Sequence, residues 1–285
     1  MNYKNITIGI VTFKSEKVIF NCLKSITGVK KIIIFDNSND LQLKKKINNQ
    51  YPQVKIILSK KNIGYGQANN RIFKLAETSH VLVLNPDTIL NKNCLKELII
   101  QANLIKNKFA ILAPSEKNKN YGFFKKKQKK YYITKNLISV DYVKGFAMLL
   151  NMSKIKKVGM FDANYFLYLE EIDLCKRLKS KEENIYLCNN AKIKHISATS
   201  SNIGFEFEKC QNWHWMWSQV YFDRKFNNYI YALKNNIFKL IKNFLKAIIF
   251  LVIFNRKKSY IFYLRFSGIY NSLIGNKSWF RPKLD

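Results

Sequence analysis

The first 113 residues alternate short, continuous apolar runs with segments of helical periodicity, and this alternation limits the folds open to the chain. The runs are rich in β-branched residues, which is typical of strands buried on both faces of a sheet. Between the runs, apolar residues recur at helical spacing, as Val18, Cys22 and Ile26 do. The pattern predicts an α/β fold, a mainly parallel sheet with helices on both faces. The predicted strands are Ile6–Thr12, Lys31–Phe35, Val54–Leu58, His80–Leu84 and Phe109–Ala113.

The pattern becomes less regular beyond these strands. The Lys- and Tyr-rich stretch Tyr121–Lys135 predicts a loop, and Val140–Asn151 predicts one strand that contains Gly145. A helix is expected at Glu171–Leu178, where Ile172, Cys175 and Leu178 share one face. Two short strands are expected after it, at Ile185–Cys188 and Ala191–Ile196.

The C-terminal part of the chain is strongly apolar. Its longest uninterrupted apolar run, Ala247–Phe254, is too short to cross a bilayer, which takes about 20 residues. On a helix over Ile237–Phe254, the polar residues form one narrow, mostly basic stripe: Lys239, Lys242, Asn243 and Lys246. Such a helix either lies in a membrane interface or packs on the preceding domain with its stripe solvated, and the basic Arg256–Lys258 favours the membrane. We expect one domain over residues 1–225 and a basic, aromatic, amphipathic membrane-interface region over residues 226–285.

The net charge of the chain is +32, from 50 Lys and Arg against 18 Asp and Glu. These basic residues are spread along the chain, and the aromatic modules that read nucleic-acid bases are not visible, so we expect no nucleic-acid partner. A membrane surface or a phosphorylated substrate remains open as an anionic partner. The five cysteines form no CxxC pair and the first ten residues lack the pattern of a secretory signal, so reduced thiols in the cytosol are expected.

Acidic residues are rare in this chain, and two of them stand just beyond predicted strands. Asp36 and Asp87 would therefore lie at the carboxyl edge of the sheet, where ligands of open α/β sheets bind. Either residue could simply begin a turn or cap a helix. Together they could bind a ribose hydroxyl group and a divalent cation, since Mg²⁺ and Mn²⁺ prefer carboxylates.

Three further features could carry chemistry. The segment Asn62–Asn70 contains Gly-x-Gly but follows the third strand and lacks a third glycine, so it is a weak dinucleotide fingerprint. The acidic cluster Glu170–Asp173 either complements a helix dipole or supplies a general base of raised pKa beside aromatic rings. His195 is either a structural residue or a metal ligand.

In their order along the chain, these segments resemble the family-2 glycosyltransferases, especially the rhamnosyltransferase-like branch with the GT-A fold. The resemblance covers about Ile6–Ser200 and depends on the ordered set rather than on one motif. The matching segments are Ile8–Phe13, Phe35–Ser38, Asn62–Asn70, Leu84–Asp87, Gly145–Leu149, Gly159–Asp162, Phe166–Cys175 and His195.

The resemblance implies a Rossmann-like mixed sheet with a helical C-terminal extension, and it implies roles for single residues. Asp87 and His195 would ligate Mg²⁺ or Mn²⁺, although Asn85 replaces the first acid of a strict Asp-x-Asp. Glu171 stands where the family commonly has its catalytic Asp, which leaves open whether Glu170 or Glu171 is the base. The implied nucleotide-sugar pocket is lined by Thr12, Phe13, Asp36, Asn37, Asn62, Gly64, Asn70 and Asn85, and the acceptor side by Gly145 and Asp173.

The activity implied is the inverting transfer of a sugar, with rhamnose as one candidate, from a nucleoside-diphosphate donor to a hydroxyl group of a lipid-linked glycan. Such a glycan would be an O-antigen or capsule precursor, and the enzyme would lie peripherally on the cytoplasmic face of the inner membrane. Two alternatives remain at this point: a nicotinamide-dependent oxidoreductase, and a non-catalytic basic protein that binds membranes or nucleic acid.

Overall fold

The structure is a computed structural model that describes residues 1–117, 120–124, 131–196 and 204–281. The chain forms two compact units. Unit 1 comprises Met1–Asp162 and Glu171–Ser201, and unit 2 comprises Ala163–Glu170 and Asn202–Asp285. This division differs from the boundary expected after residue 225, because the aromatic residues 205–226 form a helix that packs with the C-terminal helices of unit 2.

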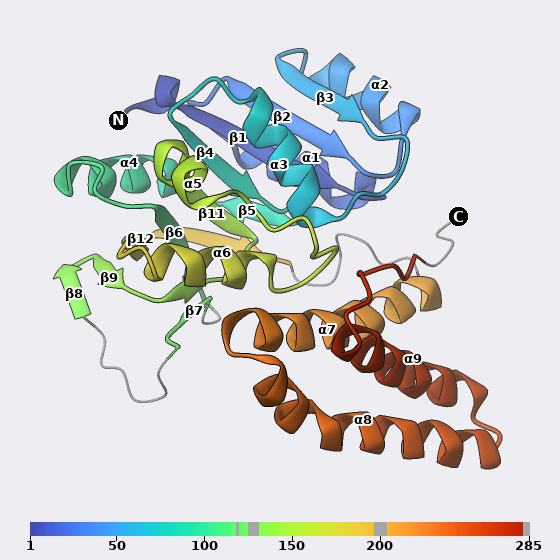
Figure 1. Ribbon diagram of the computed structural model, residues 1–285. Helices are drawn as coiled ribbons and strands as arrows, with labels where there is room; N and C mark the ends of the chain where they lie inside the picture. The colour runs from blue at the N-terminus through green and yellow to red at the C-terminus, as the bar shows by residue number, and fades with distance from the viewer. Residues whose placement is uncertain (118–119, 125–130, 197–203, 282–285) are drawn as a thin grey trace. The chain divides into compact units, whose positions relative to one another are not determined.

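Unit 1 is built on one mixed sheet (Figure 1) with the strand order β3-β2-β1-β4-β11-β6-β12-β9-β8, and β5 pairs with β12. Strands β1 to β4 are parallel, and β11 runs antiparallel between β4 and β6. The carboxyl ends of β1, β2, β4 and β12 and the amino end of β11 therefore lie along one edge. The strands are β1 Ile6–Thr12, β2 Lys31–Asp36, β3 Val54–Leu58, β4 His80–Leu84, β5 Thr88–Leu90, β6 Ile111–Glu116, β7 Tyr121–Gly122, β8 Tyr131–Thr134, β9 Leu137–Ser139, β10 Tyr142–Val143, β11 Ala147–Asn151 and β12 Ile185–His195.

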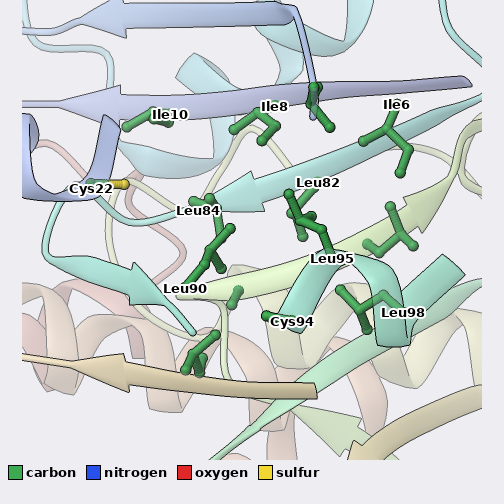
Figure 2. Packing of buried hydrophobic residues seen from close by; sticks show 14 of the residues in the cluster. Ile6, Ile8, Ile10, Cys22, Leu82, Leu84, Leu90, Cys94, Leu95 and Leu98 are labelled. Carbon is green, nitrogen blue, oxygen red and sulfur yellow. The ribbon is translucent and has the colours of Figure 1, made fainter. Parts of the chain in front are cut away.

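Helices cover both faces of this sheet, as expected from its continuous apolar strands. Figure 2 shows one face, where Ile8 of β1 and Leu82 of β4 pack with Leu95 of the helix after β5. Successive strand residues point to opposite faces, so Val81 and Val83 join the core on the other side. The helices of unit 1 are the 3₁₀ turn Tyr3–Asn5, α1 Glu16–Ser25, α2 Leu41–Gln50, α3 Tyr65–Leu75, α4 Cys94–Leu104, α5 Met152–Val158 and α6 Glu170–Lys179, whose first residue belongs to unit 2.

Three expectations about the second half of unit 1 were wrong. The predicted loop Tyr121–Lys135 contains strands β7 and β8, which are short and depend on partners elsewhere in the chain. The single strand predicted at Val140–Asn151 is divided into β10 and β11 by a turn at Gly145, and β10 joins β7 in a separate sheet. The two strands predicted after residue 184 are one strand, β12, whose pairing with β6 shifts register between Cys188 and Lys192.

Unit 2 is helical: α7 Phe205–Phe226, α8 Tyr229–Val252 and α9 Arg256–Leu273 pack on one another (Figure 1). Its core contains Trp213 and Trp217 of α7. Gly268 lets α9 approach α7 closely, because a Cβ there would lie 2.5 Å from the backbone oxygen of Trp213. The polar stripe predicted on α8 is partly packed rather than solvated, since Asn243 is buried and Lys246 Nζ lies 5.0 Å from the centre of the Phe262 ring. No helix in the described part of the chain is both long enough and apolar enough to cross a membrane.

Candidate active site

An acid and an imidazole meet at the carboxyl edge of the sheet. Asp87 follows β4, and the antiparallel pairing of β5 with β12 places Thr88 opposite His195. This register brings the His195 Nε2 atom to 3.2 Å from Asp87 Oδ1. The Asp87 side chain is almost fully buried. The two predicted metal ligands, which are distant in sequence, are therefore neighbours in the fold.

Two oxygens of this site, one of them the Asp87 oxygen that faces His195, have no hydrogen-bond partner among the described residues. Asp87 Oδ1 and Asn85 Oδ1 are both buried, and neither accepts a hydrogen bond from any residue that the structure describes. Buried oxygens left in this way usually mark a place where a water molecule, an ion or a ligand completes the site. A carboxylate beside an imidazole is a donor set that a divalent cation accepts, so these residues fit the predicted cation. Within the described ranges no cluster of three or more His, Cys, Asp or Glu could hold a metal ion.

Phe146 orients His195, a role that the sequence did not suggest. The two rings are stacked, with centroids 4.3 Å apart and planes 14° apart. The Phe146 carbonyl oxygen also accepts hydrogen bonds from the Asn85 backbone N–H at 2.8 Å and from the Thr88 hydroxyl at 3.3 Å. One residue at the start of β11 therefore holds both the imidazole and the Asn-Pro-Asp turn.

Glu171 lies against the turn that precedes Phe146. A Cβ on Gly145 would lie 3.4 Å from both Cβ and Cγ of Glu171, so glycine leaves room for this carboxylate. Burial raises the pKa of Glu171 above its ordinary value. Backbone N–H groups of Gly145 and Ile172 donate to the carboxylate, and together with the charge of Lys144 they lower its pKa in part. A carboxylate of raised pKa is a stronger base than an ordinary one, which suits it to accept a proton from a hydroxyl group.

The neighbouring acids have different surroundings. Glu170 is buried and belongs to unit 2. Asp173, predicted on the acceptor side, is fully buried and accepts a 2.6 Å hydrogen bond from Arg177 Nε in an ion pair. The guanidinium of Arg177 also donates to the carbonyl oxygens of Val158, Gly159 and Met160. Asp173 thus anchors the segment before unit 2, and the spacing of four residues to Arg177 was the signal that could have revealed the pair.

The predicted nucleotide residues Thr12 and Asp36 are joined to each other. The Thr12 hydroxyl donates to Asp36 Oδ1 at 2.8 Å, and the Ser38 hydroxyl donates to the same oxygen. The backbone N–H groups of Ser38 and Asp40 donate to Oδ2. A carboxylate can accept about four hydrogen bonds, so these donors use the full capacity of Asp36. Because three of the donors belong to Ser38 and Asp40, Asp36 fixes the conformation of the loop after β2. Phe13, which follows Thr12, is partly buried, and its backbone is bridged by the Ser15 hydroxyl.

The Asn62–Asn70 segment is tied to this loop and to the Gly145 turn. Asn37 receives a hydrogen bond from the Ile63 N–H and donates to the Gly64 carbonyl oxygen. Gly64 begins α3 with φ at +84°, a backbone conformation that favours glycine, and its N–H donates to the Asn62 side chain. The Tyr65 hydroxyl donates to the Gly145 carbonyl oxygen at 2.6 Å. A missed tyrosine therefore connects α3 to the turn that holds Glu171.

The side chain of Asn70 forms hydrogen bonds within the protein. Its side chain accepts from the Phe161 N–H at 3.0 Å and donates to the Phe161 carbonyl oxygen at 2.8 Å, which fixes the segment before unit 2 to α3. Of the residues predicted to bind the nucleotide sugar, Asn70, Asp36 and Asn37 make internal hydrogen bonds that shape loops. Asp87, His195 and Glu171 are joined by the shared Gly145–Phe146 turn.

Comparison with known proteins gives matches over most of the chain. The sequence profile described as "Glycosyl transferase family 2" matches residues 7–173. The chain is 28% identical over 214 residues to the low-salt glycan biosynthesis hexosyltransferase Agl10 of Haloferax volcanii, which covers 67% of each chain. It is also 28% identical over 223 residues to the rhamnosyltransferase WbbL of Escherichia coli K12, which covers 68% of this chain and 83% of WbbL.

Solved structures share the fold at low sequence identity. The mannosyltransferase PcManGT from Pyrobaculum calidifontis, determined with GDP-Man and Mn²⁺, has a TM-score of 0.58 at 10% identity over 94% of this chain and 87% of that one. GalNAc-T7 with UDP, GalNAc and Mn²⁺ has a TM-score of 0.55 at 13% identity over 66% of this chain, which spans only 43% of the GalNAc-T7 chain. These likenesses confirm the GT-A fold.

Proposed function

This chain belongs to glycosyl transferase family 2, and from that premise we propose that it moves a sugar from a nucleoside-diphosphate donor to a hydroxyl group of a lipid-linked glycan. Membership of the family makes the chain a glycosyltransferase and removes the oxidoreductase and non-catalytic alternatives. The relatives Agl10 and WbbL, whose names are those of a hexosyltransferase and a rhamnosyltransferase, support a hexose or rhamnose donor and a role in cell-surface polysaccharide synthesis.

The single observation that carries the proposal is the turn at Gly145–Phe146, which connects an acid–imidazole pair to a carboxylate of raised pKa. Phe146 stacks on His195, which lies 3.2 Å from Asp87, while Gly145 contacts Glu171. A sugar transferase needs one centre for the leaving diphosphate and another for the incoming hydroxyl group. A single short turn holds both kinds of group in this chain.

In the proposed reaction, Asp87 and His195 are the residues that would hold a divalent cation. Such a cation, when bound, stabilises the negative charge that develops on the leaving diphosphate. Glu171 accepts the proton of the acceptor hydroxyl group as its oxygen bonds to the anomeric carbon. The bond from that carbon to the diphosphate breaks, and the diphosphate leaves with the electron pair. Attack from the face opposite the leaving group inverts the anomeric centre.

A screen of nucleotide sugars tests this proposal. We expect calorimetry to detect binding of one class among UDP-, GDP- and dTDP-sugars, with affinity increased by Mn²⁺, and a lipid-extract acceptor to release the nucleoside diphosphate. An increase with Mn²⁺ is expected because Asp87 and His195 would supply protein ligands to a cation that also binds phosphate oxygens. If no nucleotide sugar binds with or without Mn²⁺, the proposal is wrong.

Contact with a membrane is a second part of the proposal, and it depends on an apolar face of α8. On this helix Ala232, Asn236 and Asn243 are buried. Several of its exposed apolar residues lie three and four positions apart on a different face, and Phe238 is 80% exposed. This set comprises Phe238, Ile241, Leu245, Ile248, Ile249 and Val252; Phe244 and Leu251 are also exposed, and Phe254 follows the helix. An exposed apolar helix face flanked by basic residues such as Lys242 and Arg256–Lys258 suits the interface of an anionic bilayer.

A vesicle experiment tests the apolar face. The double variant Leu245→Glu, Ile249→Glu should bind vesicles of phosphatidylethanolamine and phosphatidylglycerol at least about tenfold more weakly, because burying one such side chain contributes about 1.5–3 kcal/mol. Binding is measured by co-sedimentation at fixed salt. Leu41→Glu is the matched control, because Leu41 is an exposed apolar residue on α2 of unit 1. Equal sedimentation of the double variant and the native protein would contradict membrane contact through α8.

A further inference from the structure

Unit 2 contains a pocket that the proposed chemistry does not use. Its volume is about 370 Å³, within the range of small-ligand sites. One side is aromatic and the other carries amide and guanidinium groups. The pocket is lined by Tyr168, Gln211, Asn212, Trp215, Met216 and Arg265, from the start of unit 2, α7 and α9.

The two aromatic rings form a corner. Tyr168 and Trp215 lie with centroids 5.3 Å apart and planes 85° apart. Trp215 is 41% exposed, whereas its α7 neighbours Trp213 and Trp217 are buried in the core. Of the three tryptophans of α7, Trp215 lines the pocket. An exposed indole beside a perpendicular phenol offers apolar surface with a polar rim, which is how aromatic residues serve recognition.

The polar wall is held in place by its own hydrogen bonds. The Arg265 Nε donates to Asn212 Oδ1 at 2.6 Å, and Gln211 forms a side-chain hydrogen bond with Tyr168. Asn212 Nδ2 also donates to the Glu208 carbonyl oxygen at 2.8 Å, and each amide group retains further hydrogen-bonding capacity. In the described part of the chain, the Nη groups of Arg265 have no hydrogen bond to any residue. Amide and guanidinium groups around an aromatic corner match a ring that has an apolar face and several hydroxyl groups.

The backbone at Tyr168 is strained. Tyr168 has φ at +71° and Leu169 at +67°, and two consecutive non-glycine residues in this region are uncommon. Such strain persists where the surroundings require it, most often at functional sites. The strained pair directly precedes Glu170 and Glu171 in the chain. The Cα atoms of Tyr168 and Glu171 therefore cannot be more than about 11 Å apart.

We propose that this pocket binds a sugar ring of the acceptor glycan, so that Trp215 and Tyr168 select the acceptor. The proposal deepens and rests on the proposed function, since the acceptor must present its hydroxyl group to Glu171. Only Leu169 and Glu170 separate Tyr168 from Glu171 in the chain. The donor is recognised in unit 1 by different residues, so acceptor and donor binding are separable by mutation.

The test measures carbohydrate binding directly on the full chain. The probes are the methyl glycosides of glucose, galactose, N-acetylglucosamine and rhamnose, followed by saturation-transfer NMR and tryptophan fluorescence. At least one should bind saturably, Trp215→Ala should weaken it at least about tenfold, and Trp215→Phe should retain most of the affinity. Trp279→Phe is the matched control, because Trp279 is also half-exposed in unit 2 but does not line the pocket.

The outcomes separate this proposal from the proposed function. If nucleotide sugars bind but no methyl glycoside binds, or binding is unchanged in Trp215→Ala, the pocket assignment is wrong and the transferase remains. If glycosides bind through Trp215 but no nucleotide sugar binds, the pocket assignment stands and the transferase is wrong. Circular dichroism of Trp215→Ala and its calorimetric affinity for the donor should match the native protein, which excludes simple unfolding.

Discussion

Replacing Glu171 by Gln is expected to lower the rate of sugar transfer by about 10²–10⁴-fold, the usual contribution of a positioned general base. Glutamine is nearly isosteric with glutamate and can remain beside Gly145, but it cannot accept the proton of the acceptor hydroxyl group. Donor affinity should be unchanged, because the proposed reaction assigns donor binding to Asp87 and His195 and not to Glu171. Single-turnover transfer and calorimetric donor affinity, measured on the same preparation, check both expectations.

The pH dependence of transfer makes this test sharper. Burial raises the pKa of Glu171, and the base works only when it is deprotonated. The rate should therefore rise with pH through that raised pKa and fall on the acid side of it. The positive charge of Lys144 lowers the same pKa, so Lys144→Gln should move the acid limb to higher pH. An acid limb that does not move in Lys144→Gln would contradict Glu171 as the titrating base.

Glu170→Gln is the comparison that decides between the two adjacent acids. Glu170 is buried and belongs to unit 2, whereas Glu171 contacts Gly145, the residue before Phe146. We therefore expect Glu170→Gln to retain more activity than Glu171→Gln and to keep the native pH profile. A larger loss in Glu170→Gln would assign the base to Glu170.

The parallel half of the sheet could be predicted from the sequence, because strands buried on both faces are continuous apolar runs. The later strands could not. Strand β8 is an exposed edge strand, and β10 has only two residues, so their existence depends on pairing partners rather than on local pattern. The division of Val140–Asn151 depends likewise on contacts of the Gly145 turn with Tyr65 and Glu171. None of these contacts is local in sequence.

The sequence indicated which residues belong to the candidate site, but it did not indicate how these residues contact one another. Asp87 stood out because acids are rare and it follows a strand, but its contact with His195 is produced by the β5–β12 pairing, and β5 has only three residues. The stacking role of Phe146 had no local signal, since it is one apolar residue within the apolar segment Val140–Asn151. Acidic residues predicted to bind a ligand can instead interact with other residues of the protein, as the hydrogen bonds of Asp36 and the ion pair of Asp173 show.

Replacing Asp87 by Asn should abolish the response of the protein to Mn²⁺ and lower transfer by at least about 10²-fold. The carboxylate supplies the anionic oxygen at the pair, and an amide is a weak ligand for a divalent cation. Any cation that binds the folded state alone stabilises it, by about 2.7 kcal/mol at a hundredfold excess over its Kd. Mn²⁺ should therefore raise the unfolding temperature of the native protein and leave that of Asp87→Asn unchanged.

Asp40→Asn is the matched control for this charge change. Asp40 caps α2 through its side chain, and asparagine caps helices equally well, so the variant removes one acid of unit 1 without loss of the helix. It should keep the full Mn²⁺ response. His195→Gln should weaken Mn²⁺ binding, since it removes the nitrogen ligand but leaves the carboxylate. A Mn²⁺-induced rise of the unfolding temperature that persists in Asp87→Asn would place the cation elsewhere, and Glu171 would then lose the diphosphate centre that its proposed reaction requires.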